Sequence, residues 1–164
     1  MKIKVGFGYD VHRLEAGYKL MVGGIEVPFE KGSVGHSDGD VLIHAIMDAL
    51  LGAAGLRDIG QQFPDTDPAL KGIDSKLLLK RTVKLITDHG FTTGNIDATV
   101  ALQKPKIGHL VPHMQKLLAS ILNTPVSDIS IKATTTEQLG FVGAGEGIAA
   151  YAVVLLEKTN PAKE

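Results

Sequence analysis

The chain has 164 residues, of which 44% are hydrophobic and 21% are charged, so it has room for one globular domain and is not a disordered protein. Its 17 Lys and Arg residues are balanced by 18 Asp and Glu residues, which excludes the basic field that a nucleic-acid partner would need. It has no cysteine, so disulfides, thiolate nucleophiles and Cys-based zinc sites are excluded, and a transition metal would need His and carboxylate ligands.

The sequence predicts a β-strand close to its N-terminus. Residues 2–9 alternate as a strand, with no signal peptide or transit segment in front of them, and we therefore expect a cytoplasmic protein. No apolar run approaches the roughly 20 residues that cross a bilayer, so no membrane association is expected. The pair Gly23-Gly24 separates apolar runs at 18–22 and 25–29, which predicts a β-hairpin.

The later elements follow from helical and strand periodicity. Ser37 precedes apolar residues at helical spacing, and Asp40 stands three residues later as in a capping box, which predicts a helix over 38–54. The Pro and Asp turn signals of 55–72 predict an ordered loop that is long enough to be functional. The remaining predictions are helices at 75–89 and 109–122 and strands at 95–103, 128–135 and 147–156.

These elements predict an α/β fold of the α+β sandwich type. We expect a mixed β-sheet with helices packed on one face, plus an N-terminal β-hairpin. Residues 1–158 should form a single domain, and 159–164 a disordered C-terminal tail.

Three residues suggest an open zinc site. In Gly8-Tyr9-Asp10-Val11-His12, the side chains of Asp10 and His12 point to the same face of a strand, about 6.5 Å apart. His44, on the predicted helix, can supply a third ligand. Two imidazoles and one carboxylate leave one position of a tetrahedral Zn²⁺ open, as in catalytic sites. The alternative is that the Asp-x-His triplet arises by chance and that each histidine makes ordinary hydrogen bonds.

Asp40 and Asp48 flank His44 at helical spacing. Each lies four residues from His44, so either carboxylate could orient the imidazole from behind, as carboxylates often do for metal-bound histidines. The alternative is an ordinary solvated helix face.

A second group of polar residues lies near the C-terminus. Lys132-Ala133-Thr134-Thr135-Thr136-Glu137 ends a predicted strand and leads into a glycine-rich segment. Its hydroxyls and N–H groups suit a phosphate, and Glu137 suits Mg²⁺. Because the chain is not basic, a diphosphate would be neutralised mainly by metal ions, with help from Lys106 and Lys132. The alternative is a Thr-rich strand end that runs into a flexible loop.

Five motifs together resemble the 2-C-methyl-D-erythritol 2,4-cyclodiphosphate synthase family, and they span nearly the whole chain. They are Gly8-Tyr9-Asp10-Val11-His12, His36-Ser37-Asp38-Gly39-Asp40, Asp58-Ile59-Gly60, Phe63-Pro64-Asp65-Thr66-Asp67 and Lys132-Ala133-Thr134-Thr135-Thr136-Glu137. The resemblance implies a homotrimer with active sites between subunits, acting in the non-mevalonate route to isoprenoid precursors. The implied enzyme is a metal-dependent phosphorus–oxygen lyase. In 4-diphosphocytidyl-2-C-methyl-D-erythritol 2-phosphate, the 2-phosphate attacks the β-phosphorus, expels CMP and gives the cyclic diphosphate.

The resemblance also implies roles for individual residues. Asp10, His12 and His44 would bind one Zn²⁺ per subunit, and Glu137 would hold Mg²⁺ or Mn²⁺. His36 and Thr135 would hold phosphate and stabilise the transition state. The expected substrate-binding positions are Ser37, Asp58, Gly60, Phe63, Asp65, Leu102, Pro105, Lys106, Ile107, Gly108, Thr134, Thr136 and Phe141. The chain departs from many relatives at Ala144, where they carry an Arg that lines a cavity on the trimer axis proposed to hold an isoprenoid diphosphate.

Two other functions use the same residues. A zinc-dependent phosphodiesterase would activate water at the open metal position. A trimeric nucleotide or isoprenoid-diphosphate binding module would use zinc only to stabilise its fold. The cyclodiphosphate synthase is the function that we expect.

Overall fold

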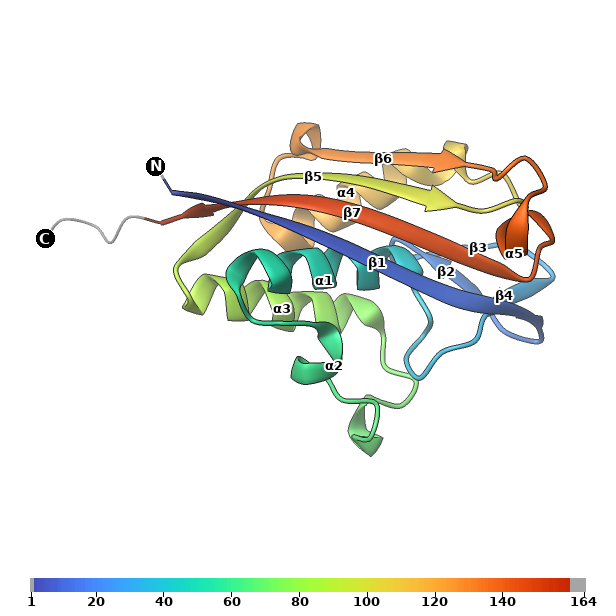
Figure 1. Cartoon of the computed structure of the whole chain (residues 1–164), viewed down its shortest axis with the longest axis horizontal. Coiled ribbons are helices and arrows are strands. Elements are labelled where there is room, and N and C mark those ends of the chain that lie inside the picture. The colour runs from blue at the N-terminus through green and yellow to red at the C-terminus, as the bar shows by residue number, and fades with distance from the viewer. Residues whose placement is uncertain (1, 160–164) are drawn as a thin grey trace, which may run out of the picture.

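A computed structural model describes residues 2–159, which form a mixed five-stranded sheet and a separate hairpin (Figure 1). The strand order in the sheet is β4-β1-β7-β5-β6, and all neighbours are antiparallel except the parallel pair β5 and β6. The strands are β1 (Ile3–Ala16), β4 (Lys31–Ser33), β5 (Phe91–Ala101), β6 (Ile129–Thr134) and β7 (Gly147–Lys158), and the hairpin is β2 (Leu20–Val22) with β3 (Ile25–Val27).

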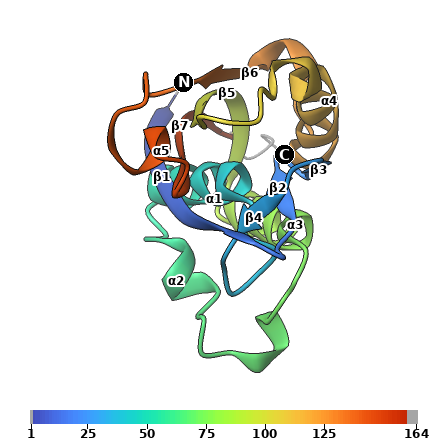
Figure 2. The ribbon, with the colours of Figure 1, turned by 90° about the vertical axis from the view of Figure 1, so that its right-hand side faces the viewer.

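Three longer helices lie together on one side of the sheet (Figure 2). They are α1 (Val41–Ala54), α3 (Ser75–Asp88) and α4 (Val111–Leu122). Short helical turns are α2 (Ile59–Gln62), α5 (Gly140–Gly143) and 3-10 turns at Pro68–Leu70, Gly108–Leu110 and Val126–Asp128. The mixed sheet, the one-sided helical layer and the N-terminal hairpin confirm the expected fold class.

Helix α1 forms the centre of the core. Its apolar side chains, such as Ile46 and Leu50, are fully buried between β1, β7 and α3. The opposite face of the sheet carries large apolar side chains that are exposed in the single chain. They are Ile3, Val5, Phe7, Tyr9 and Val11 of β1, with Tyr151 and Val153 of β7. A continuous apolar face of this kind usually marks an interaction surface.

Several predicted boundaries were wrong. The first strand does not end at residue 9, because pairing with β7 continues as far as Arg13 and pairing with β4 continues to Ala16. The helix predicted over 38–54 begins at residue 41. Asp40 is its N-cap, with extended backbone and a carboxylate that accepts a hydrogen bond from the Ile43 N–H. The expected loop at 55–72 contains α2 and a 3-10 turn, and β4 and α5 were not predicted.

Two further expectations concern the C-terminal tail and a membrane span. Thr159, the first residue of the expected tail, donates its backbone N–H to the Gly90 carbonyl oxygen, and residues 160–164 lie outside the described part of the chain. Within residues 2–159, no helix combines the length and the apolar character that a membrane span requires.

Candidate metal centre and substrate pockets

Two glycines bring the proposed metal ligands of β1 against helix α1. Gly6, Gly8, Asp10 and His12 alternate along one face of the strand. A Cβ atom at either glycine would lie 1.9 Å from a backbone oxygen of α1, so strand and helix are in direct backbone contact. Asp10 and His12 follow on the same face and therefore reach His44, which α1 presents toward them.

The side chains of Asp10, His12 and His44 converge on one point. Asp10 Oδ2 lies 2.9 Å from His12 Nε2 and 3.0 Å from His44 Nδ1, and the two ring nitrogens are 3.1 Å apart. In a tetrahedral zinc site with ligands about 2.0 Å from the ion, ligand atoms lie about 3.3 Å from one another. The spacing of the three atoms is therefore close to that of a zinc site.

The electrostatics of the cluster favour an added positive charge. Burial alone would raise the pKa of Asp10, but the hydrogen bonds and charges of His12 and His44 outweigh it and lower the pKa to about 2. Burial disfavours protonated His12, but the Asp10 carboxylate outweighs burial and raises the pKa of His12 above its usual value. A proton or a metal cation can supply the charge that Asp10 attracts.

The outward contact of His12 is compatible with a metal ligand. Its Nδ1 lies 3.1 Å from the Val34 carbonyl oxygen, which only accepts hydrogen bonds, so Nδ1 carries a hydrogen and Nε2 is the nitrogen that can bind a proton or a metal beside Asp10. An imidazole held this way by a carbonyl group is typical of metal ligands. The donor set and its spacing fit Zn²⁺.

The expected support of His44 by Asp40 and Asp48 is not seen. The Asp40 carboxylate is fully buried and accepts the N–H groups of Gly23, Gly24 and Ile43. Burial raises the pKa of Asp40, although these three donors oppose the change. Asp48 accepts the Ile59 N–H at 2.9 Å, and burial raises its pKa too.

His44 instead contacts two serines. Its Nε2 lies 3.0 Å from Ser37 Oγ and 3.0 Å from Ser75 Oγ. Ser75 was missed in the sequence analysis, because it is 31 residues from His44 and its only local signal is its place at the start of a helix.

One pocket of about 290 Å³ opens at the metal cluster and gathers many of the expected substrate-binding residues. It is lined by His12, His36, Ser37, His44, Ile59, Gly60, Phe63, Asp65, Leu70 and Leu78. Asp58 stands just outside this lining as the N-cap of α2, where its carboxylate accepts the Gln61 N–H at 3.0 Å. The segment 58–65 therefore reaches the pocket mainly through α2.

A second pocket, of about 440 Å³, gathers most of the remaining expected positions. Its lining includes Leu102, Pro105, Lys106, Ile107, Gly108, Thr134 and Thr135. It lies where the carboxyl ends of the parallel strands β5 and β6 meet. Among residues 2–159, no side chain lines both this pocket and the one at the metal cluster.

The segment after β6 holds the proposed magnesium ligand. The Thr135 hydroxyl donates to Glu137 Oε1 at 3.0 Å, and the Thr136 hydroxyl donates to the Leu139 carbonyl oxygen at 2.7 Å. Glu137 and Gln138 both have left-handed backbone, with φ of 53° and 65°. Non-glycine residues in this conformation are concentrated at ligand-binding loops.

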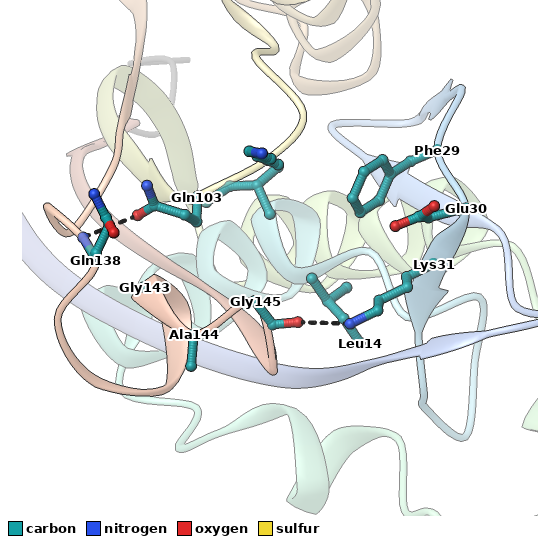
Figure 3. A pocket seen from close by; sticks show the side chains of 11 residues that line it. Leu14, Phe29, Glu30, Lys31, Gln103, Gln138, Gly143, Ala144 and Gly145 are labelled. Carbon is teal, nitrogen blue, oxygen red and sulfur yellow. Dashed lines mark hydrogen bonds between the residues drawn. The ribbon is translucent and has the colours of Figure 1, made fainter.

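Two further pockets lie near the same segment. Phe141 lines one of about 510 Å³ together with Tyr9 and Val11 of the exposed sheet face. Figure 3 shows another, of about 450 Å³, in which Ala144 is part of the lining. There the Lys31 ammonium donates to the Gly145 carbonyl oxygen at 3.2 Å, and the Gln138 N–H donates to the Gln103 side-chain oxygen at 3.3 Å.

Comparison with known proteins identifies the family. Residues 3–157 match the model of the YgbB family. The chain belongs to this family. A YgbB relative from Porphyromonas gingivalis, named 2-C-methyl-D-erythritol 2,4-cyclodiphosphate synthase, is 60% identical over 153 residues, which are 93% of this chain and 94% of the relative.

Solved structures agree with the YgbB assignment. The bifunctional IspDF from Campylobacter jejuni has a TM-score of 0.93 and 42% identity, and the match covers 97% of this chain and 43% of that longer one. A CDP complex of IspF from Plasmodium falciparum has a TM-score of 0.84 and 34% identity, with 96% of this chain and 97% of that chain covered. The fold of this chain is therefore shared with solved proteins, and one of them is a complex with CDP.

Proposed function

We propose that this chain converts 4-diphosphocytidyl-2-C-methyl-D-erythritol 2-phosphate into 2-C-methyl-D-erythritol 2,4-cyclodiphosphate and CMP, in the non-mevalonate route to isoprenoid precursors. The observation that carries the proposal is the convergence of Asp10, His12 and His44 at a pocket lined by His36, in a chain of the YgbB family. This arrangement suits phosphoryl transfer, which depends on in-line positioning and on stabilisation of phosphate charge.

The reaction needs no protein nucleophile. An oxygen of the substrate's 2-phosphate forms a bond to the β-phosphorus, and the bond from that phosphorus to the CMP oxygen breaks. Zinc held by Asp10, His12 and His44 would supply Lewis-acid stabilisation of phosphate charge. His36 and Ser37 line the same pocket and would donate hydrogen bonds that hold the phosphates in line for attack.

The second half of the site would come from the segment after β6. Glu137 would hold Mg²⁺ or Mn²⁺, which normally keep phosphate oxygens among their ligands. The Thr135 hydroxyl would then donate to a phosphate oxygen in place of Glu137. The neighbouring loop at 105–108 would receive the cytosine ring in the pocket at the ends of β5 and β6.

Two observations support a homotrimer with shared active sites. The exposed apolar face of β1 and β7 is suited to burial against other subunits. The expected substrate-binding residues divide between two pockets with no shared lining, as they would if neighbouring subunits each supplied one half of a site.

Turnover of the diphosphocytidyl substrate with Zn²⁺ and Mg²⁺, followed by phosphorus NMR, tests the proposal. Wild type and the control His113→Ala, which changes an exposed histidine on α4, should form CMP and the cyclic diphosphate, whereas His44→Ala should not. CMP with an acyclic product would indicate a phosphodiesterase. Metal binding without any reaction would indicate a binding module.

A further inference from the structure

A chain of hydrogen bonds leads away from the metal cluster behind His44. The His44 ring turns Nδ1 toward Asp10 and points Nε2 at Ser75 Oγ, 3.0 Å away. Ser75 is fully buried and is the first residue of α3. Its hydroxyl donates to Asp38 Oδ1, and its backbone N–H donates to Asp38 Oδ2 at 3.0 Å. One carboxylate therefore holds both polar groups of Ser75.

Asp38 is itself fixed by the backbone around it. Its N–H donates to the Ile73 carbonyl oxygen at 3.1 Å, and its Oδ1 also accepts the Asp40 N–H at 3.2 Å. These contacts join the loop before α1 to the loop before α3. The position of Ser75 behind His44 is therefore set by two helix starts that are far apart in the sequence.

The direction of each hydrogen bond follows from the chemistry of the groups. A carboxylate can only accept, so the Ser75 hydroxyl must donate to Asp38. The Ser75 oxygen then has only lone pairs to offer His44, so a hydrogen bond between these two groups requires the ring hydrogen on Nε2. When Nε2 keeps its hydrogen, Nδ1 is the ring nitrogen that can bind a proton or a metal beside Asp10, and this is the tautomer that binds a metal through Nδ1.

Ser37 lies at the same distance from His44 but is held differently. Its oxygen accepts the Gly39 N–H at 3.3 Å, and within residues 2–159 its hydroxyl makes no hydrogen bond to a carboxylate. It also lines the metal pocket, where a phosphate can compete for its hydrogen. Ser75, which does not line that pocket, is the fixed partner of His44.

We infer that Asp38 and Ser75 are positioning residues of the metal centre. The Asp38–Ser75–His44 chain fixes the ring orientation of His44 and keeps a hydrogen on Nε2, which leaves Nδ1 for the metal, so that metal affinity depends on two residues that touch neither metal nor substrate. The inference rests on the metal binding in the proposed function, and it adds two residues to the site that supports it.

A matched pair of variants tests the hydroxyl of Ser75. Ser75→Thr keeps the hydroxyl, and Ser75→Val has nearly the same shape without it. Zinc binding is measured by chelator competition without substrate. The dissociation constant should be about 10- to 100-fold larger for Ser75→Val than for Ser75→Thr. In the cobalt-substituted protein, the visible absorption of Ser75→Val should also differ from that of wild type. Equal zinc affinities in the two variants would overturn the inference.

A second measurement needs no variant. In metal-free wild type, at about pH 8.5 so that excess protons do not mask the ring tautomer, nitrogen NMR of the His44 ring should show a hydrogen on Nε2. A ring without a hydrogen on Nε2 would overturn the inference even if neither variant folds. Both measurements are made without turnover, so a wild-type chain that binds zinc but fails to cyclise the substrate would contradict the proposed function alone.

Discussion

The contact between β1 and α1 makes Gly8, like Gly6, a position at which a single added methyl group should be strongly destabilising. A Cβ atom at Gly8 would lie 1.9 Å from the Ala45 carbonyl oxygen and 2.8 Å from the Ala49 nitrogen. Both atoms belong to the helix backbone, so no side-chain rotation relieves the overlap. To restore a carbon–oxygen separation of about 3.3 Å, strand and helix must move apart by more than about 1 Å.

This movement should lower both stability and metal affinity. Overpacking typically costs 1–3 kcal/mol, and with backbone on both sides we expect about 3 kcal/mol for Gly8→Ala. For a chain of this size, that corresponds to a fall in Tm of about 6–12 °C. The separation would also pull Asp10 and His12 away from His44, although metal–ligand distances tolerate only about 0.2 Å.

Thermal unfolding of the metal-free protein and zinc titration measure the two effects. Gly52→Ala is the matched control, because Gly52 lies on the same helix and a Cβ atom there would have no neighbour within 4 Å. It should leave zinc affinity unchanged and raise stability by at most about 1 kcal/mol, since alanine favours helix. A Gly8→Ala protein with wild-type Tm and wild-type zinc affinity would refute the role of this contact.

Asp40→Ala should lower the free energy of unfolding in urea by about 3 kcal/mol or more, because three backbone N–H groups lose their acceptor in the core. Asp74→Ala, which removes only a partly exposed cap of α3, should cost about 1 kcal/mol, and equal losses would contradict this reasoning. The raised pKa of His12 means that the metal-free folded protein gains stability from His12 protonation, fully below about pH 6.5, and loses it as pH rises through the raised value. The stability of wild type relative to His12→Gln should therefore decrease with rising pH, by at most about 1.4 kcal/mol per unit, and a constant difference would argue against the raised pKa. Phe7→Asp should reduce the assembled mass in sedimentation velocity, whereas Leu77→Asp on α3 should not, and equal masses would exclude the apolar sheet face as the subunit interface.

The part of the metal centre that depends on local geometry could be predicted from the sequence. Asp10 and His12 face the same way because any strand alternates its side chains. The approach of His44 depends on close packing of α1 against Gly6 and Gly8, which periodicity does not specify. The sequence offered His44 as a candidate third ligand from its place on a predicted helix, and the resemblance to a family implied the same role.

The supporting contacts of His44 could not be predicted, for a physical reason. The spacing of Asp40 and Asp48 places them beside His44 only if all three residues are helical, and Asp40 is an extended N-cap whose carboxylate turns to the helix backbone and the hairpin. The actual support, Ser75 with Asp38, joins residues 37 apart in sequence. Contacts of that range depend on how two helices pack, which no local pattern records.

The division of the candidate site between two pockets leads to a prediction about mixed assemblies. His12→Ala should abolish the metal half of a site, and Thr135→Ala should disable the other half. If neighbouring subunits each contribute one half, a trimer that contains both variants holds some sites in which both halves are intact. For random mixing in equal amounts, about one quarter of all sites should be intact, because each half is intact in about half of the subunits.

Co-refolding of the two inactive variants, followed by the cyclisation assay, measures this fraction. Recovery of about one quarter of wild-type activity would require sites shared between subunits, whereas each variant refolded alone should stay inactive. If both halves belonged to one subunit, every site in the mixture would carry a defect, and activity would not return at any mixing ratio. The ratio dependence adds a second check, because shared sites give maximal recovery at equal amounts and none at either extreme.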